Sequence, residues 1–145
     1  MPTPTSIPVV DGLFDVQDGA PALVGAKCTA CGTHYFPRRA RCSNPACNGA
    51  EAAPVRLGPR GVLYSWSVQA YRPPPLFGMD PWAPYAIGLV DLPEGVRVMA
   101  MLTGAPPEAF QIGSPMQLRL EPLRVDADGR EVLTWKFAPV AEHVA

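Results

Sequence analysis

Four cysteines lie within one stretch of twenty residues, and their spacing is that of a metal-binding knuckle pair. They are Cys28, Cys31, Cys42 and Cys47, which read as Cys-x2-Cys, ten residues, then Cys-x4-Cys. Each close pair can hold one side of a tetrahedral ion while the intervening residues bring the two pairs together. With all four thiolates on the metal, no coordination position is left for a reactive water. The pattern therefore predicts a structural zinc site.

The cellular setting bears on whether these thiols bind a metal or form disulfides. Residues 1–10 carry no Lys or Arg and no apolar run long enough for a secretory signal, and the chain has no membrane-spanning stretch. We expect a cytoplasmic protein, where disulfides are rare and clustered thiols favour a metal. Iron in a rubredoxin-like all-thiolate site is the alternative metal, because tetrahedral sulfur sites suit both ions.

The composition favours a small metal-stapled module joined to a compact domain. The chain has 145 residues, with 19 prolines and 13 glycines, and 48% of it is hydrophobic. Such a chain can fill a core, so the prolines indicate many turns and strand ends rather than disorder. The formal charge of −1 lacks the overall basic field that non-specific nucleic-acid binding uses.

Elements that would position the cysteines can be read from the residue pattern. We expect an extended arm over residues 1–22 with one helical turn around 12–16, a zinc ribbon over 23–54, and a mainly β domain with a C-terminal tail over 55–145. Hairpin turns are expected at 92–95 and 127–129. Strand-like runs cover residues 61–70, with Val62, Tyr64, Trp66 and Val68 facing inward, and residues 85–91, 96–103, 116–125 and 131–137. Five such strands favour a closed barrel of the oligonucleotide/oligosaccharide-binding (OB) type.

The connection over residues 71–84 is too apolar for an idle solvent loop. It holds five prolines together with Phe77, Met79 and Trp82, side chains of the kinds enriched at the centres of interfaces. Prolines stiffen the segment and reduce the entropy lost on docking. The connection is predicted either to bind a partner or to fold back and cap one end of the barrel.

The order of these pieces resembles a known family. The pieces are residues 28–32, 35–38 and 42–47 of the ribbon, and residues 58–65, 85–91, 95 and 110–113 of the barrel. Together they are similar to the zinc-ribbon plus OB-fold proteins called domain of unknown function 35 (DUF35), and the small subunit of benzoylsuccinyl-CoA thiolase is a member of similar size and layout. Two departures are the short arm in place of a helical hairpin and the wider second cysteine pair.

The resemblance implies a function that the residues alone do not. Members of the family accompany thiolase-like or ketoacyl-synthase-like proteins and are associated with acyl-CoA substrates. This implies a non-catalytic accessory subunit of a thiolase-like complex that binds or gates acyl-CoA and holds its partner active, in CoA-dependent degradation of aromatic compounds. The implied ligands are structural Zn²⁺ and a coenzyme A thioester, and the implied partner is a thiolase-like subunit.

One dense basic cluster lies in the ribbon. Arg38, Arg39 and Arg41, with Lys27 nearby, could grip the phosphates of coenzyme A or the carboxylates of a partner, because guanidinium groups bind both in bidentate geometry. The competing interpretation is a solvated loop whose arginines offset the negative charge of a thiolate–zinc cluster.

Catalysis by this chain alone is not expected. His34 and His143 stand in no nucleophile motif, and His34 is more simply a bystander than a fifth candidate ligand. Asp126-x-Asp128-Gly129 and the Asp91/Glu94 pair are more simply turn residues than a calcium loop or an acid–base pair.

Two other function classes remain open at this point. A nucleic-acid binder would stack bases on outward-facing side chains of Tyr64, Trp66, Trp135 and Phe137. The formal charge of −1 argues against this class. An electron carrier would hold iron on the four thiolates.

Overall fold

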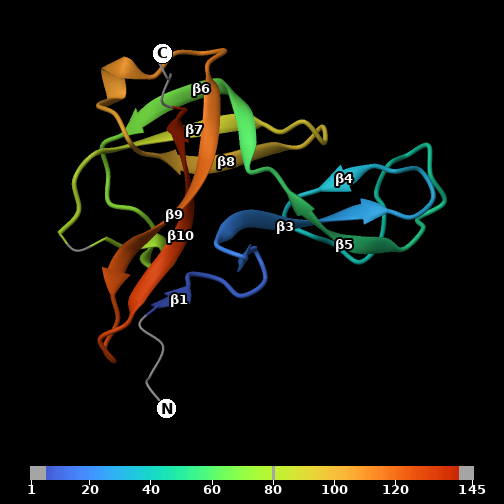
Figure 1. The fold of residues 1–145 in the computed structure, drawn as a ribbon, viewed down its shortest axis with the longest axis horizontal. Helices are drawn as coiled ribbons and strands as arrows, with labels where there is room; N and C mark the ends of the chain where they lie inside the picture. Colours follow the sequence, from blue (N-terminus) through green and yellow to red (C-terminus); the bar gives the residue numbers. More distant parts are fainter. Residues whose placement is uncertain (1–5, 80, 141–145) are drawn as a thin grey trace.

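A zinc-ribbon sheet and a closed barrel follow one another along the chain, as the computed structural model in Figure 1 shows. The structure describes residues 6–79 and 81–140. Within these ranges no helix is long and apolar enough to cross a membrane. Helix is confined there to two short 3₁₀ turns, Pro75–Phe77 and Pro107–Ala109.

Five strands close the barrel. They are β6 (Arg60–Gln69), β7 (Tyr85–Asp91), β8 (Arg97–Leu102), β9 (Pro115–Val125) and β10 (Glu131–Pro139). Neighbours pair in the order β6-β7-β8-β10-β9, and β9 returns to β6. Only the β10–β8 pairing within this ring is parallel. The predicted five-stranded barrel is confirmed, with every strand ending within two residues of its predicted bounds.

Turn chemistry explains the two tight hairpins of the barrel. In the β7–β8 turn Gly95 has φ +91°, a left-handed conformation that glycine adopts without strain. Its N–H donates to the Leu92 carbonyl at 3.0 Å. In the β9–β10 turn Gly129 has φ +79° and donates to the Asp126 carbonyl at 3.0 Å. Both predicted hairpins are therefore present.

The facing of β6 differs from the prediction. Leu63 is fully buried in the barrel, while Val62 and Tyr64 are 47% and 48% exposed, so the residues expected to face inward face outward here. A β-bulge between Leu63 and Ser65 then shifts the register. Beyond the bulge Trp66 is half-buried against Phe110 in an edge-to-face contact. Strict alternation fails because an inserted residue reverses which side chains face the core.

The ribbon sheet is built around one central strand, β3 (Ala20–Cys28). Strands β2 (Phe14–Gln17) and β4 (His34–Tyr35) pair with successive parts of β3, and β5 (Ala52–Leu57) pairs along it from Leu23 to Cys28. The expected helical turn at 12–16 is wrong, because β2 starts at Phe14. Asp18 (φ 52°) and Gly19 (φ 78°) make the tight turn between β2 and β3.

The first described strand joins the barrel rather than the ribbon. Strand β1 (Ser6–Pro8) lies parallel to the start of β10, with Ile7 opposite Val132. The amino-terminal segment therefore contacts the barrel first and the ribbon second. This order ties the arm to both parts of the molecule.

One hydrophobic core runs through ribbon and barrel. Leu23 of β3 and Leu57 of β5 are fully buried and belong to the same cluster as Leu63 and Phe137 of the barrel. Burial of side chains of this size contributes about 2 kcal/mol each. The ribbon is therefore packed onto the barrel and is not a freely tethered module.

Candidate metal centre and apolar groove

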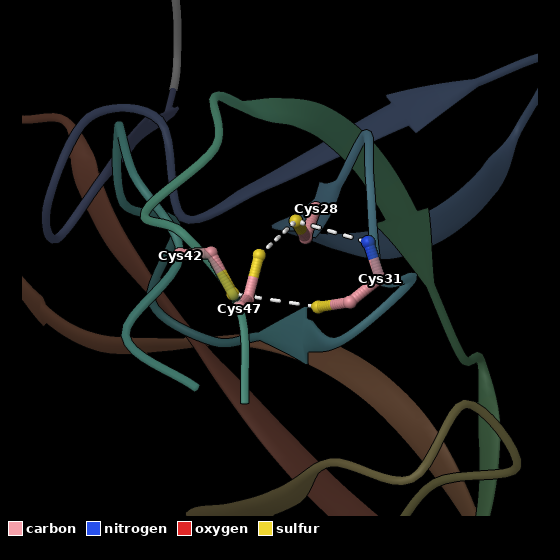
Figure 2. Close-up of side chains that lie close together, drawn as sticks. All are labelled: Cys28, Cys31, Cys42 and Cys47. Atoms are coloured by element: carbon pink, nitrogen blue, oxygen red, sulfur yellow. Dashed lines mark hydrogen bonds between the residues drawn. The ribbon is translucent and has the colours of Figure 1, made fainter. Parts of the chain in front are cut away.

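The four cysteines converge at the far end of the ribbon. Their Sγ atoms all lie within 4.8 Å of one another. The Sγ atoms of Cys28 and Cys47 are 3.7 Å apart, and those of Cys31 and Cys42 are 3.5 Å apart. Figure 2 shows the four side chains close together, with a dashed line between the sulfurs of each of these two pairs. Each close contact joins one residue of the first pair to one of the second, so the two knuckles face each other across a common centre.

This arrangement fits a tetrahedral zinc ion. With Zn–S bonds of about 2.3 Å, the sulfurs of a tetrahedral site are separated by about 3.8 Å. The two observed distances of 3.5 and 3.7 Å are close to this value. All four cysteines are free thiols. No histidine joins the cluster in the part of the chain that the structure describes, so His34 is not grouped with the sulfurs.

Local backbone geometry points N–H groups at the sulfurs. The N–H groups of Ala30 and Cys31 donate to Cys28 Sγ at 3.4 Å, and Asn44 N–H donates to Cys42 Sγ at 3.4 Å. In the second knuckle the Asn44 side-chain oxygen accepts from Ala46 N–H at 3.0 Å, which forms a turn between Cys42 and Cys47. These outer contacts hold the metal-facing sulfurs in place.

Hydrogen bonding also favours the thiolate form of two cysteines. The Thr33 hydroxyl, 3.1 Å from Cys31 Sγ, and the Thr33 N–H lower the pKa of Cys31 to about 6. The N–H groups of Cys31 and Ala30 lower the pKa of Cys28. The Tyr35 hydroxyl acts to lower the pKa of Cys42, but desolvation and bonding to neighbouring thiols leave that pKa raised. A thiolate is the form that binds zinc.

The arginines of the ribbon loop are partly engaged with the loop itself. Arg39 lies over the Tyr35 ring at 5.2 Å, and its Nε donates to the Arg41 carbonyl at 2.8 Å. Arg41 donates to the Gly49 carbonyl at 2.9 Å. Arg38 and Arg39 line a small hollow of about 290 Å³ beside Ala26 and Pro54. Lys27 is exposed on β3 opposite His34.

The Pro-rich connection folds back onto the barrel and also leaves apolar side chains outside. Phe77 stands edge-on to Trp135 with ring centroids 5.8 Å apart. Trp82 lies under the Arg72 guanidinium at 5.8 Å and Met79 is half-buried, while Leu76 is 49% exposed. The connection therefore packs on the barrel and still presents apolar surface.

Between this connection and the barrel lies an apolar groove of about 610 Å³. Its floor comes from the outward faces of β7 and β8, and its walls come from β6, from the connection and from β10. The lining includes Trp66, Tyr71, Phe77, Tyr85, Ile87, Leu89, Met99, Met101, Thr134 and Trp135.

The sequence analysis predicted Phe77 of the groove wall as a binding residue but did not predict the residues of the groove floor on β7 and β8. The available signal was that β7 and β8 are apolar on both faces. Ile87 and Leu89 alternate with buried Ala86 and Val90, so an outward apolar face follows from the strand period. An outward apolar row on two neighbouring strands indicates a binding face rather than a solvated one.

The aromatic residues of the nucleic-acid hypothesis do not form one stacking surface. Phe137 is fully buried, and Trp66 packs edge-to-face on Phe110. Tyr64 is covered by the Arg97 guanidinium at 3.3 Å from its ring centroid. Bases stack on open ring faces. The expected row of four outward rings is therefore not present.

The acidic residues considered for chemistry are turn and surface residues. Asp91 pairs with Arg97, whose Nε donates at 2.6 Å, and this bond lowers the pKa of Asp91. Asp126 Oδ1 accepts from the N–H groups of Asp128 and Arg130, both at 2.9 Å. These contacts agree with the turn interpretation. His143 lies outside the described residues.

The ribbon and the barrel match the two domains of one protein family. Residues 19–52 match the family described as "ChsH2, rubredoxin-like zinc ribbon domain", and residues 54–121 match "ChsH2, C-terminal OB-fold domain". The solved Ltp2-ChsH2(DUF35) aldolase is similar in structure, with a TM-score of 0.64 and 31% identity, covering 83% of this chain and 86% of that chain.

Two curated proteins are similar over most of their length. The benzoylsuccinyl-CoA thiolase subunit BbsA of Thauera aromatica is 36% identical over 121 residues, covering 83% of this chain and 78% of its own. A DUF35 domain-containing scaffold protein of Methanocaldococcus jannaschii is 32% identical over 120 residues, covering 81% of this chain and 82% of its own.

Proposed function

Because this chain belongs to the DUF35 family of proteins that join a zinc ribbon to an OB-fold barrel, we propose that it is a non-catalytic accessory subunit of a thiolase-like acyl-CoA C-acyltransferase complex. One observation carries the proposal. A thiolase subunit and an aldolase complex each match this chain over 83% of its length. Its role is to bind or gate the acyl-CoA substrate and to hold the partner in its active form.

The proposed metal is zinc on Cys28, Cys31, Cys42 and Cys47. When bound, zinc supplies a structural crosslink, because four protein ligands fill its tetrahedral shell. The sulfur separations of 3.5 and 3.7 Å support this assignment. A ribbon this small has little core beyond the end that packs on the barrel, so the crosslink orders the loop that carries the arginines.

Two surfaces are proposed to meet the partner or the coenzyme A part of the substrate. The first is the basic ribbon loop with Lys27, Arg38, Arg39 and Arg41, all four of them exposed. Guanidinium groups suit phosphate and carboxylate oxygens. The second is the Pro-rich connection with Phe77, Met79 and Trp82, which is supported by its exposed neighbour Leu76. CoA-dependent degradation of aromatic compounds is the proposed setting, from the thiolase relative.

In the complex this chain contributes position and shielding rather than a nucleophile. A rigid barrel beside the entrance of an acyl-transfer site excludes water and restricts the orientations of the thioester. The nucleophile and the general bases belong to the partner. This division agrees with the four thiols being gathered in one cluster that suits a metal ion.

The testing experiment is purification of the tagged chain from the cells that make it. Proteins that co-purify are identified by mass spectrometry, metal is assayed in the same sample, and acyl-transfer activity is measured with and without the chain. We expect a stoichiometric thiolase-like protein, about one zinc per chain, and activity that needs both subunits. A chain that purifies alone with nucleic acid, or one that is red and carries iron, would contradict the proposal.

A further inference from the structure

The apolar groove has a floor that the fold alone does not require to be apolar. Ile87 lies opposite Met101 and Leu89 opposite Met99 on the outward faces of β7 and β8. Met99 is 60% exposed, although its strand neighbours Val98 and Ala100 fill the core. A solvated outer face would carry polar side chains at these positions. The floor is therefore a built apolar surface.

The walls of the groove are held in place by specific contacts. The indole N–H of Trp135 donates to the Met99 carbonyl at 2.9 Å, which fixes the ring beside the floor. Arg124 donates to the carbonyls of Leu76 and Gly78, both at 3.0 Å, and so fixes the turn that carries Phe77. Three prolines, Pro73 to Pro75, further restrict the backbone before this turn. The groove is thus formed before any ligand enters.

Polarity of the lining restricts what can bind. Among the residues that the structure describes, none of those lining the groove carries a formal charge at neutral pH, and its polar groups come from Ser65, Ser67, Gln69, Thr134 and the tyrosines. A phosphate or carboxylate buried here would lose its hydration without gaining a counter-charge. OB-fold faces that hold nucleic acid use a basic groove with stacked rings. Such an anionic ligand does not fit this surface.

The size of the groove restricts the ligand further. Its volume of about 610 Å³ lies in the range of small-molecule sites. A two-carbon acyl group would leave most of that space empty. Trp66, Tyr85 and Trp135 line the groove, and aromatic side chains pack favourably on another flat ring. A bulky ring-bearing group uses this surface better than a short chain.

We propose that this groove binds the uncharged, ring-bearing acyl part of the thioester substrate, while the anionic coenzyme part lies outside it. This inference rests on the proposed function, because it takes the thioester from the partner's reaction. It names the substrate class, which is a bulky aromatic or alicyclic acyl group without a second carboxylate at the end that enters the groove. The hydroxyl groups along the groove donate hydrogen bonds to the thioester carbonyl oxygen.

The test uses the full-length, zinc-loaded chain and small thioesters that lack any nucleotide. The probes are the N-acetylcysteamine thioesters of benzoate, acetate and succinate. Binding is measured by calorimetry and by ¹H–¹⁵N NMR shifts. We expect the benzoyl probe to bind at least about tenfold more tightly than the other two. Shifts should fall on β7, β8 and β10 and not on the cysteine loop. Equal affinity for all three probes, or shifts confined to the ribbon, would overturn the inference.

Two exposed apolar residues provide a matched pair of variants. Met99→Glu places a charge in the groove, whereas Ile112→Glu places one at an equally open site outside it, with 60% and 69% exposure in the native chain. Neither side chain fills the core, so both variants should fold. We expect Met99→Glu to weaken benzoyl binding at least about tenfold and Ile112→Glu to leave it unchanged. Ser67→Phe, which fills the groove without charge, should weaken binding similarly. Unchanged affinity in Met99→Glu and Ser67→Phe would place the ligand elsewhere.

Co-purification separates the failure of this inference from that of the proposed function. If the native chain brings down a thiolase-like partner but binds none of the probes, and Met99→Glu loses that partner, the groove is a protein-docking surface and the inference fails alone. If the chain binds the benzoyl probe but purifies without a partner, the proposed function fails and the groove assignment stands. Retention of the partner by Met99→Glu together with loss of probe binding supports both.

Discussion

The ring of Phe36 stands edge-on to the indole of Trp135, with centroids 5.9 Å apart and planes at 76°. Phe36 directly follows the ribbon strand β4, and Trp135 belongs to the last strand of the barrel. Phe14 of β2 and Phe77 of the Pro-rich connection contact the same indole. One side chain of the barrel therefore joins the ribbon, the arm and the wall of the apolar groove.

A double-mutant cycle should detect this contact as an energetic coupling. Phe36→Leu and Trp135→Leu each remove one ring, and the double variant removes both. We expect a coupling free energy of about 1 kcal/mol, because edge-to-face pairs contribute this much beyond burial. The measurement is chemical denaturation of the four proteins. Phe36→Leu combined with Tyr64→Leu is the control, since Tyr64 contacts Arg97 instead. Additivity in the first cycle would show that the contact contributes nothing.

Loss of the metal should lower the stability of both the ribbon and the barrel. Cys42→Ser removes one proposed ligand, and because Leu23 and Leu57 share a core with the barrel, we expect the barrel to unfold at a lower temperature too. Zinc binding to such ribbons is worth on the order of 10 kcal/mol, so the drop should be large.

Metal content by elemental analysis and thermal unfolding by circular dichroism check this expectation together. Ser43→Ala, a substitution at the next residue that removes no sulfur, should keep both zinc and melting temperature. A metal-free Cys42→Ser chain with the native melting temperature would show that ribbon and barrel are energetically separate.

Much of the barrel could be predicted from sequence because its signals are local. Strand 85–91 was predicted with its observed bounds, and alternation plus Pro and Gly turns located the others. The ribbon cysteines were predicted from spacing alone, and the structure brings their sulfurs together.

What sequence could not predict depends on long-range contacts. Strand β1 has three residues and exists because it pairs with β10, more than 120 residues later. The bulge after Leu63 changes which residues face the core without any marker in the local pattern. The groove needs the outward faces of β7 and β8 beside Trp135 and Phe77, and this meeting exists only once the barrel has closed.

Removal of Arg124 should loosen the wall of the groove. Its guanidinium donates to two carbonyls of the Pro75–Gly78 turn, so Arg124→Met leaves both without that partner while keeping the length of the side chain. We expect faster amide hydrogen exchange at residues 76–79 and a loss of stability of about 1 kcal/mol. Arg119→Met is the control, because among the described residues Arg119 makes a 3.7 Å ion pair with Glu121 and no hydrogen bond to the turn. Equal exchange in both variants would mean that the prolines alone fix the turn.

Stability at acid pH should depend on the carboxylate of Asp126. The N–H groups of Arg130 and Asp128 and the Arg130 guanidinium hold the pKa of Asp126 below its usual value. Its pKa in the unfolded chain is about 3.9, so the folded state is stabilised above that pH, and this contribution is lost as pH falls through the lower, folded pKa. The native chain should therefore melt higher than Asp126→Asn at pH 7, and the gap should close on acidification. Acid also releases zinc from thiolates, but both chains share that effect, so the difference between their melting temperatures isolates the contribution of the carboxylate.

Asp128→Asn is the control. The Asp128 side chain is 74% exposed, so this variant should show a smaller difference from the native melting temperature at pH 7. A gap for Asp126→Asn that stays constant from pH 7 to pH 3 would show that the turn is held by geometry and not by the charge.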